Sequence, residues 1–494
     1  MKHTTVKKLQ PWTKKDWILN VVVYLVNFLV LAGMFVAEIA FSADGKELIP
    51  LLLEKQAFFL LVLLAMVIFL MVIYLAFEQR DFLKNASNSQ MLFLIMELSL
   101  AVCYFTGEFV SEFFRPLSLV ALLVLFVTDA KTATFTEVIF CLIFFLFDTF
   151  TQAITVDNTF SISTLFLIMG TCSGFIGVYV MKNVYSRIKL FLLSLLISIP
   201  CVICIFMPFV HIPEGQYLIS IVYGALSGPL AAVIFTIFLP VIEALFNKVS
   251  CFKYAELTNH NAKFIKKMII DASGTFNHSM VVSNVAEACA SAINEDPLLA
   301  RTCAYYHDVG KIRRPEMFKE NQADGINPHD ELTPELSVNI IRSHTRDGYK
   351  LIVKNHLPKQ IADVCLEHHG TMPILYFYDK AKKFTDGEVD IQEYCYAGPK
   401  PRSKIAAIIM IADSSEAATR ALKDRSRENV TKVVRKIVND RLDFGQFDEC
   451  EITLKELNII INATVNSLTG VYHGRVEYPK VNFEEIKTDY SDED

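Results

Sequence analysis

The stretch Cys303–Phe318, "CAYYHDVGKIRRPEMF", places His307 beside Asp308, with Gly310 and Lys311 directly after them. Such a pair at the end of an apolar helical run has two interpretations. It is a metal site, or it is an ordinary pair of polar residues at a buried helix end. Adjacent His and Asp residues occur often by chance, so the dipeptide alone does not decide, and the rest of the chain has to.

The composition divides the chain into a membrane part and a water-soluble part. Of the 494 residues 53% are hydrophobic, and most apolar runs fall within residues 17–246. The formal net charge of −6 is modest and argues against a nucleic-acid polymer as partner. Eleven cysteines are scattered, several of them within apolar runs, and suggest a reducing cytosol and a membrane rather than a disulfide framework.

The expected fold is all-α, with a polytopic α-helical transmembrane bundle followed by a cytoplasmic all-α domain. Helical spacing of apolar residues runs through the soluble part, and no convincing run of alternating strands is present. The expected division is a basic N-terminal segment at 1–16, a transmembrane domain at 17–246, a coupling helix at 247–275, a catalytic domain at 276–478 and an acidic tail at 479–494.

About 20 apolar residues are needed to cross a bilayer as a helix. Eight runs qualify, although the third and fourth are short: 17–40, 57–77, 91–107, 116–129, 135–155, 160–181, 188–210 and 217–246. With the N-terminus inside, the inner segments carry eleven Lys and Arg residues and the outer loops carry three. This bias predicts a multi-pass protein of the plasma membrane whose N-terminus and C-terminal half are both cytoplasmic.

Two features within the apolar runs need an explanation. Gly170 and Gly174, and also Gly224 and Gly228, have the spacing that allows close helix packing, which we favour over a signalling hinge. Glu97 and Asp148 interrupt apolar runs. Each could line a ligand pocket or face the interior of the bundle.

Seven His and Asp residues of the soluble part share an apolar helical context. They are His278, His307, Asp308, His344, His368, His369 and Asp413. So many buried polar groups would lack partners in an ordinary core, and a metal cluster would provide them. Seven ligands exceed the four of a tetrahedral zinc site and suit two ions about 3.5–4 Å apart.

Asp308 is the expected bridge, because a carboxylate can give one oxygen to each ion. One ion would then take His278, His307, Asp308 and Asp413, and the other Asp308, His344, His368 and His369. Imidazole and carboxylate ligands favour iron or manganese as the two divalent ions. Such a pair activates water and holds a phosphate for attack, so Asp308 is expected to be catalytic.

Lys311 is the expected substrate-binding and catalytic cation, since it could place a positive charge near the phosphate. The alternative is a solvated lysine at a helix end. Arg313, Arg314 and Arg346 could also reach the substrate, and the sequence does not choose among them.

The order of these motifs resembles the HD superfamily of metal-dependent phosphohydrolases, and "HDVGK" is similar to its HDIG subgroup. Together with the apolar runs, "GINPHDELTPELS", "HHGT" and "YAGPKPRSKIAAIIMIADSSEAA" resemble the bacterial seven-transmembrane HD receptors. That resemblance implies hydrolysis of cyclic di-AMP to linear pApA on a dinuclear iron or manganese centre held by the same seven residues. The family usually has a large extracellular domain after its first span, whereas here only about fifteen residues, "SADGKELIPLLLEKQ", fill that gap.

Other functions remain as alternatives. Enzymes of this superfamily that cleave cyclic di-GMP carry a GYP-type signature after the paired His, and "HHGTMPILYFY" lacks it. An enzyme acting on another nucleotide, or a membrane receptor that binds a nucleotide without cleaving it, are further hypotheses. A homodimer through the HD domain or the transmembrane helices is compatible with all of them.

Overall fold

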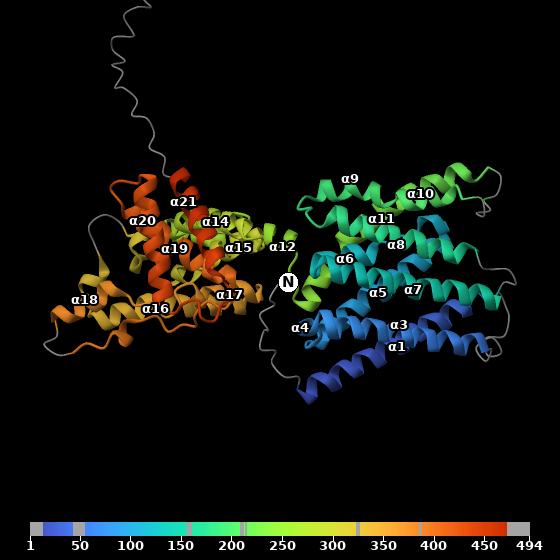
Figure 1. Cartoon of the computed structure of the whole chain (residues 1–494), viewed down its shortest axis with the longest axis horizontal. Helices are drawn as coiled ribbons and strands as arrows, with labels where there is room; N and C mark the ends of the chain where they lie inside the picture. The colour runs from blue at the N-terminus through green and yellow to red at the C-terminus, as the bar shows by residue number, and fades with distance from the viewer. Residues whose placement is uncertain are drawn as a thin grey trace, which may run out of the picture. The chain divides into compact units, whose positions relative to one another are not determined.

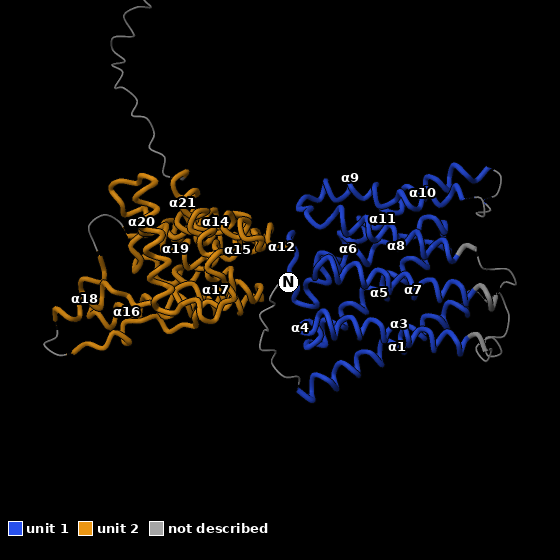
Figure 2. The backbone as a smooth tube through the Cα atoms, in the orientation of Figure 1, with its two compact units in different colours: residues 1–252 blue, residues 253–494 orange. Residues whose placement is uncertain are grey.

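The computed structural model describes residues 13–42, 55–155, 161–207, 212, 215–322, 327–384 and 388–471. The chain divides into two compact units, Met1–Phe252 and Lys253–Asp494 (Figure 2). Within the described residues the secondary structure is helical apart from one isolated β-bridge between Pro373 and Cys395, which confirms the all-α prediction. The acidic tail, most of the basic N-terminal segment and most of the segment 42–56 after the first span lie outside the described residues.

Long apolar helices lie side by side in the first unit (Figure 1). The described part of the chain contains seven helical stretches that are long and apolar enough to cross a membrane. They are formed by α1 (Lys14–Ser42), α3 (Lys55–Glu78), α5 (Ala86–Phe109), α7 (Ala130–Thr155), α8 (Ser161–Met181), α9 (Arg187–Ile197) with α10 (Ile199–Ile205), and α11 (Tyr217–Phe246).

The fourth expected span, 116–129, is not a membrane-spanning helix. Here the chain forms only the nine-residue helix α6 (Leu119–Val127). At 1.5 Å per residue this helix is about 13 Å long, less than half of a hydrocarbon core of roughly 30 Å. Residues 119–124 are fully buried, so the high hydropathy of this run reflects the interior of the bundle and not a surface that faces lipid.

The segment that contains α6 still passes from one end of the bundle to the other. Before α6, Arg115 lies 3.4 Å from Asp148 near the end of α7. After α6, Asp129 accepts a hydrogen bond at 3.1 Å from the side-chain amide of Gln79, and Gln79 lies at the end of α3. The chain therefore crosses the bundle here through an irregular stretch and a short helix. With this crossing included, the number of crossings is even, as expected from the sequence.

The start of α1 and the end of α11 therefore lie at the same end of the bundle. Asn20 of α1 donates a hydrogen bond to the Leu83 carbonyl at 2.9 Å. The Lys248 ammonium, just after α11, lies 5.1 Å from the centre of the ring of Phe82. Both contacts are made with the short connection between α3 and α5, which contains α4 (Arg80–Leu83).

A buried carboxylate compensates for the break in the helical path. Glu137 of α7 is 1% exposed and accepts a hydrogen bond from the Ala121 amide in the first turn of α6, at 2.8 Å. Helix N-termini leave amide hydrogens without partners, and such groups are costly where water is absent. Of the two carboxylates noted in the sequence, Asp148 pairs with Arg115 in the bundle interior, whereas Oε1 of Glu97 has no hydrogen-bond partner in the described part of the chain.

Both glycine pairs lie where helices approach closely. A Cβ atom at Gly174 would overlap the Glu137 side chain, and one at Gly228 would overlap the Ser194 carbonyl oxygen of α9. Close packing is therefore the physical role that the structure gives to the small residues.

The second unit is a helical domain with a continuous apolar core. Its helices are α13 (Lys263–Asp271), α14 (Ser273–Ala292), α15 (Pro297–Tyr306), α16 (Pro334–Lys354), α17 (Lys359–Glu367), α18 (Leu375–Phe384), α19 (Lys404–Ala421), α20 (Arg427–Asp443) and α21 (Leu454–Val471). Local sequence sets several of the starts: Asp296 and Thr333 accept hydrogen bonds from the first turns of α15 and α16, and each is followed by a proline.

The expected coupling helix at 247–275 is wrong as a single helix. The chain forms α12 (Cys251–Leu257), then a turn, and then α13. Asn259 causes the interruption, because its side chain accepts a hydrogen bond from the Asn261 amide at 2.8 Å. Such local bonds by asparagine compete with helix formation.

Replacing Gly228 by alanine should destabilise the bundle, since the new Cβ would overlap backbone of α9 that cannot rotate away. We expect a loss of about 1–3 kcal/mol, the usual range for overpacking. Thermal unfolding of the full chain in detergent measures it. Gly33→Ala is the matched control, because nothing lies within 4 Å of a Cβ at that helical position. Equal midpoints for the two variants would contradict the packing role.

Candidate metal centre

The second unit brings the seven predicted ligand residues together from different helices. His278 lies on α14, His344 on α16 and Asp413 on α19. His307 and Asp308 follow directly after α15, and His368 and His369 follow α17. Their ligand atoms form two groups, each with its atoms within 4.8 Å of one another: His278, His307, Asp308 and Asp413, and Asp308, His344, His368 and His369.

Asp308 belongs to both groups and divides its two oxygens between them. Its Oδ2 lies 3.2 Å from Nε2 of His307 and 3.9 Å from Nε2 of His278. Its Oδ1 lies 3.3 Å from Nε2 of His344 and 3.6 Å from Nε2 of His368. This is the arrangement required of a carboxylate that bridges two cations.

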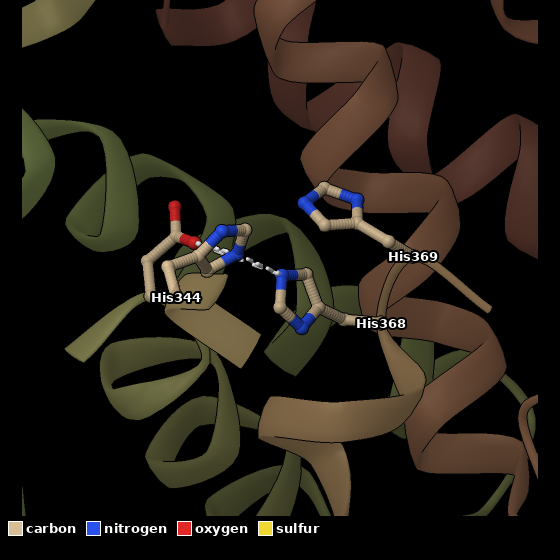
Figure 3. Close-up of side chains that lie close together, drawn as sticks. His344, His368 and His369 are labelled. Carbon is tan, nitrogen blue, oxygen red and sulfur yellow. Dashed lines mark hydrogen bonds and ion pairs between the residues drawn. The ribbon is translucent and has the colours of Figure 1, made fainter. Parts of the chain in front are cut away.

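Asp413 closes the other side of the cluster. Its Oδ1 lies 2.9 Å from Nε2 of His278, and its Oδ2 lies 3.6 Å from Nδ1 of His369. The three rings of His344, His368 and His369 converge in Figure 3, where Nε2 of His344 and Nε2 of His368 are 3.3 Å apart. Two nitrogen lone pairs that face each other at this separation repel, so this arrangement favours a cation or a proton shared between the two nitrogens.

The backbone fixes the orientation of three of the imidazole rings. Nδ1 of His307 donates to the Ala304 carbonyl at 2.7 Å, Nδ1 of His344 donates to Ile341 at 2.6 Å, and Nδ1 of His368 donates to Val364 at 3.1 Å. A carbonyl oxygen only accepts, so Nδ1 of each ring carries a proton and Nε2 faces the centre. Outer partners of this kind typically orient metal-binding histidines.

The donor atoms fit a metal centre. Nε2 of His307 and Oδ1 of Asp308 are buried and lack hydrogen-bond partners among the described residues. Both residues are at most 1% exposed, and leaving such atoms without partners is costly. Nitrogen and carboxylate donors together suit divalent iron, manganese or zinc.

Electrostatics within the cluster keep the carboxylates ionised. Burial alone would raise the pKa of Asp308, but His307 and Lys311 lower the pKa well below its ordinary value. Burial would lower the pKa of His307, but Asp308 and Asp413 outweigh it and raise that pKa to about 10, so a metal ion that bound this ring would have to displace a proton from Nε2. Burial also lowers the pKa of His369, with a further contribution from His368, so that ring is neutral and available as a ligand.

Lys311 is not the solvated lysine of the alternative interpretation. Its side chain is 12% exposed, and its ammonium lies 2.7 Å from Oδ2 of Asp308 and 2.7 Å from Glu320. The three arginines noted in the sequence are exposed, and Arg313 pairs with Asp347 at 2.6 Å.

Three residues at the centre were missed from the sequence. Glu416 accepts a hydrogen bond from Nδ1 of His278 at 2.5 Å, Glu320 binds Lys311, and Tyr396 stacks on His369 with ring centres 4.2 Å apart. Glu416 follows Asp413 by three residues on one helix, so helical spacing could have revealed it. Glu320 lies in a three-residue 3-10 helix (Lys319–Asn321) and Tyr396 in an irregular segment, and neither carries such a signal.

Fold and site together define a class of protein: a helical bundle able to span a membrane, joined to a helical domain whose histidines and aspartates could hold metal ions. Residues 55–250 match the family described as a 7TM receptor with intracellular HD hydrolase, and residues 275–418 match the HD domain. The chain belongs to this family of seven-transmembrane receptors with an HD hydrolase domain.

Two curated relatives are named cyclic-di-AMP phosphodiesterase PgpH. The protein of Listeria monocytogenes serotype 1/2a (strain 10403S) is 40% identical over 65% of this chain and 45% of its own length. That of Bacillus subtilis (strain 168) is 43% identical over 52% of this chain and 36% of its own length. The chain thus spans less than half the length of both relatives. A crystal structure of the L. monocytogenes PgpH HD domain in complex with cyclic di-AMP is 47% identical, covering 44% of this chain and 100% of that one, with a TM-score of 0.42.

Replacing Glu416 by glutamine should weaken metal binding without disrupting the fold. The amide still accepts a hydrogen bond from His278 but removes the negative charge that strengthens the ring as a ligand. Loss of such an outer partner typically lowers metal affinity about 10–100-fold. Competition with a chelator, followed by metal analysis of the full chain, measures it. Glu428→Gln, at an exposed position of α20, is the control, and equal affinities in the two variants would contradict this role.

Proposed function

We propose that this protein is a membrane-bound phosphodiesterase that hydrolyses cyclic di-AMP to linear pApA and so lowers the level of that second messenger. The observation that carries the proposal is the division of the two Asp308 oxygens between two groups of histidines. The names of the two relatives support cyclic di-AMP as the substrate, because both are called cyclic-di-AMP phosphodiesterases.

The proposed cofactors are two divalent ions, iron or manganese, one held by each group of ligands. His278, His307, Asp308 and Asp413 would hold one ion, and Asp308, His344, His368 and His369 the other. Such ions supply Lewis-acid chemistry, because they lower the pKa of water and neutralise charge on a phosphodiester.

The residues of the chain prepare the site for an anionic substrate. Asp308, Asp413, Glu320 and Glu416 bring four carboxylates to the centre, against two cations, the ammonium of Lys311 and the guanidinium of Arg420, which lies 3.5 Å from Glu416. This negative charge suits divalent cations, and bound cations would in turn make the local charge favourable for a phosphodiester. The anchored rings hold the ligand nitrogens in place, so little reorganisation is needed on binding.

Lys311 is proposed to contact the phosphate as well as Asp308. A lysine ammonium has three hydrogens to donate. Two of them are directed to Asp308 and Glu320, which leaves one for a phosphate oxygen. The two carboxylates also hold the flexible side chain in place before the substrate arrives.

We also propose that the HD domain is cytoplasmic. The excess of Lys and Arg in the inner segments of the sequence supports this orientation, and so does the return of α11 to the end of the bundle where α1 begins. A cytoplasmic domain has direct access to a soluble dinucleotide.

The substrate prediction is tested with the full chain, purified in detergent and loaded anaerobically with Mn²⁺ or Fe²⁺. Cyclic di-AMP should be converted to pApA much faster than cyclic di-GMP is linearised, as followed by chromatography. Asp308→Asn is the control, because it removes the shared charge and should abolish both turnover and retention of both ions. Turnover of cyclic di-GMP alone, or of neither dinucleotide, would contradict the proposal.

Replacing Lys311 by methionine should lower kcat/KM for cyclic di-AMP about 100-fold, the usual effect of losing one donor to a developing charge. Metal content should not fall, because the variant leaves Asp308 and Glu320 without their cation and so favours a divalent ion. Steady-state kinetics and metal analysis together distinguish two roles of Lys311, contact with the substrate and stabilisation of the Asp308 carboxylate. Loss of metal in this variant, or activity equal to that of the exposed control Lys359→Met, would contradict the contact.

A further inference from the structure

A second cavity lies next to the metal centre but shares none of its ligands. It has a volume of about 310 Å³ and is formed by α13, α16 and the 3-10 helix η2 (Val309–Arg313). Val309 and Gly310, which line it, are the two residues between Asp308 and Lys311 of the centre. One turn of backbone therefore borders both sites.

The lining of the cavity combines an apolar floor with a basic rim. Phe264, Ile312 and Leu351 contribute apolar surface. The rim carries four basic residues, with only one acid, Asp347, among the lining residues: Lys267, Arg313, Lys350 and Lys354. Asp347 is already paired with Arg313 at 2.6 Å, so three lysines from two helices remain to face an anion.

An ordinary solvated surface does not account for this arrangement. Lysines whose only role is to keep a surface soluble are usually interspersed with acidic residues and do not surround a cavity. Here they come from two segments about 85 residues apart and surround a cavity of the size that small ligands occupy, roughly 300 Å³ or more. Exposed apolar side chains on the same two helices, Ile270 and Val353, extend the apolar surface beyond the cavity.

The turn between the two sites has no freedom to move independently of α16. A Cβ atom at Gly310 would overlap the His344 carbonyl oxygen and the Gly348 amide. His344 is itself one of the proposed ligands, and the Lys311 amide donates to the Asp308 carbonyl at 3.0 Å. A ligand that draws α13 and α16 together would therefore press on the backbone that positions Asp308 and Lys311.

We propose that this cavity is a regulatory site for a phosphate-bearing ligand that also carries an apolar group, and that its occupancy changes turnover at the metal centre through the 308–313 turn. The lysines would bind the phosphate, and the floor would bind the apolar group. Two sources share this chemistry, an anionic phospholipid headgroup and a soluble organic phosphate. The effect on turnover rests on the proposed phosphodiesterase function, whereas the binding site does not.

The full chain in nanodiscs provides the test, with hydrogen–deuterium exchange as a readout that needs no activity. Discs of phosphatidylcholine are compared with discs of phosphatidylcholine and phosphatidylglycerol in equal parts. In a further arm, phenyl phosphate, a soluble phosphate with an apolar ring, is added to the neutral discs. The Lys350→Glu/Lys354→Glu variant is matched by Lys423→Glu/Lys436→Glu, which makes the same charge change at exposed positions outside the cavity.

Slower exchange in residues 263–271 and 347–354 is expected with the anionic lipid if the source is the membrane, or with phenyl phosphate if the source is soluble. This protection should be lost in the cavity variant and kept in the control. Turnover should change about fivefold or more in the same arm, the lower end of usual allosteric coupling. Absence of protection in both arms overturns the site, and protection with unchanged turnover overturns the coupling. If no dinucleotide is cleaved under any condition, the proposed function fails, while the exchange data still decide the site.

Discussion

The charge of Asp308 is the constraint on which the second unit depends. A carboxylate that is 1% exposed is stable only when nearby groups compensate for its lost hydration. His278 and His344 supply these groups from α14 and α16, while His307 and His368 do so from the ends of α15 and α17. The domain is therefore assembled around a small polar centre, and the apolar core surrounds it.

That constraint extends outward in layers. Backbone carbonyls orient three of the rings, Glu416 orients His278, and Glu320 shares Lys311 with Asp308. Each of these partners fixes either the rotamer of a side chain at the centre or the ring nitrogen that carries a proton. The same segments leave a basic cavity on a neighbouring face of the 308–313 turn, so the residues that follow Asp308 also line that cavity.

The bundle solves a related problem with the same chemistry. A short helix buried among long ones leaves amides without partners in a place that excludes water, and Glu137 accepts from the Ala121 amide at 2.8 Å. Close approach of α9 to α11, at Gly228, fills the remaining space. In both units, then, a buried carboxylate accepts or pairs with polar groups that would otherwise lack partners.

The sequence alone determined the class of fold, seven of the eight helical runs and the seven residues that meet at the centre. Apolar periodicity and run length are local properties, and each of the seven residues lies in an apolar helix or directly after one, in the order typical of the HD superfamily. Only the tertiary structure decided that the fourth run is a buried short helix, that Glu416, Glu320 and Tyr396 join the centre, and that lysines of α13 and α16 surround a cavity. These features depend on distances between residues far apart in the chain, and hydropathy cannot distinguish burial in lipid from burial in protein.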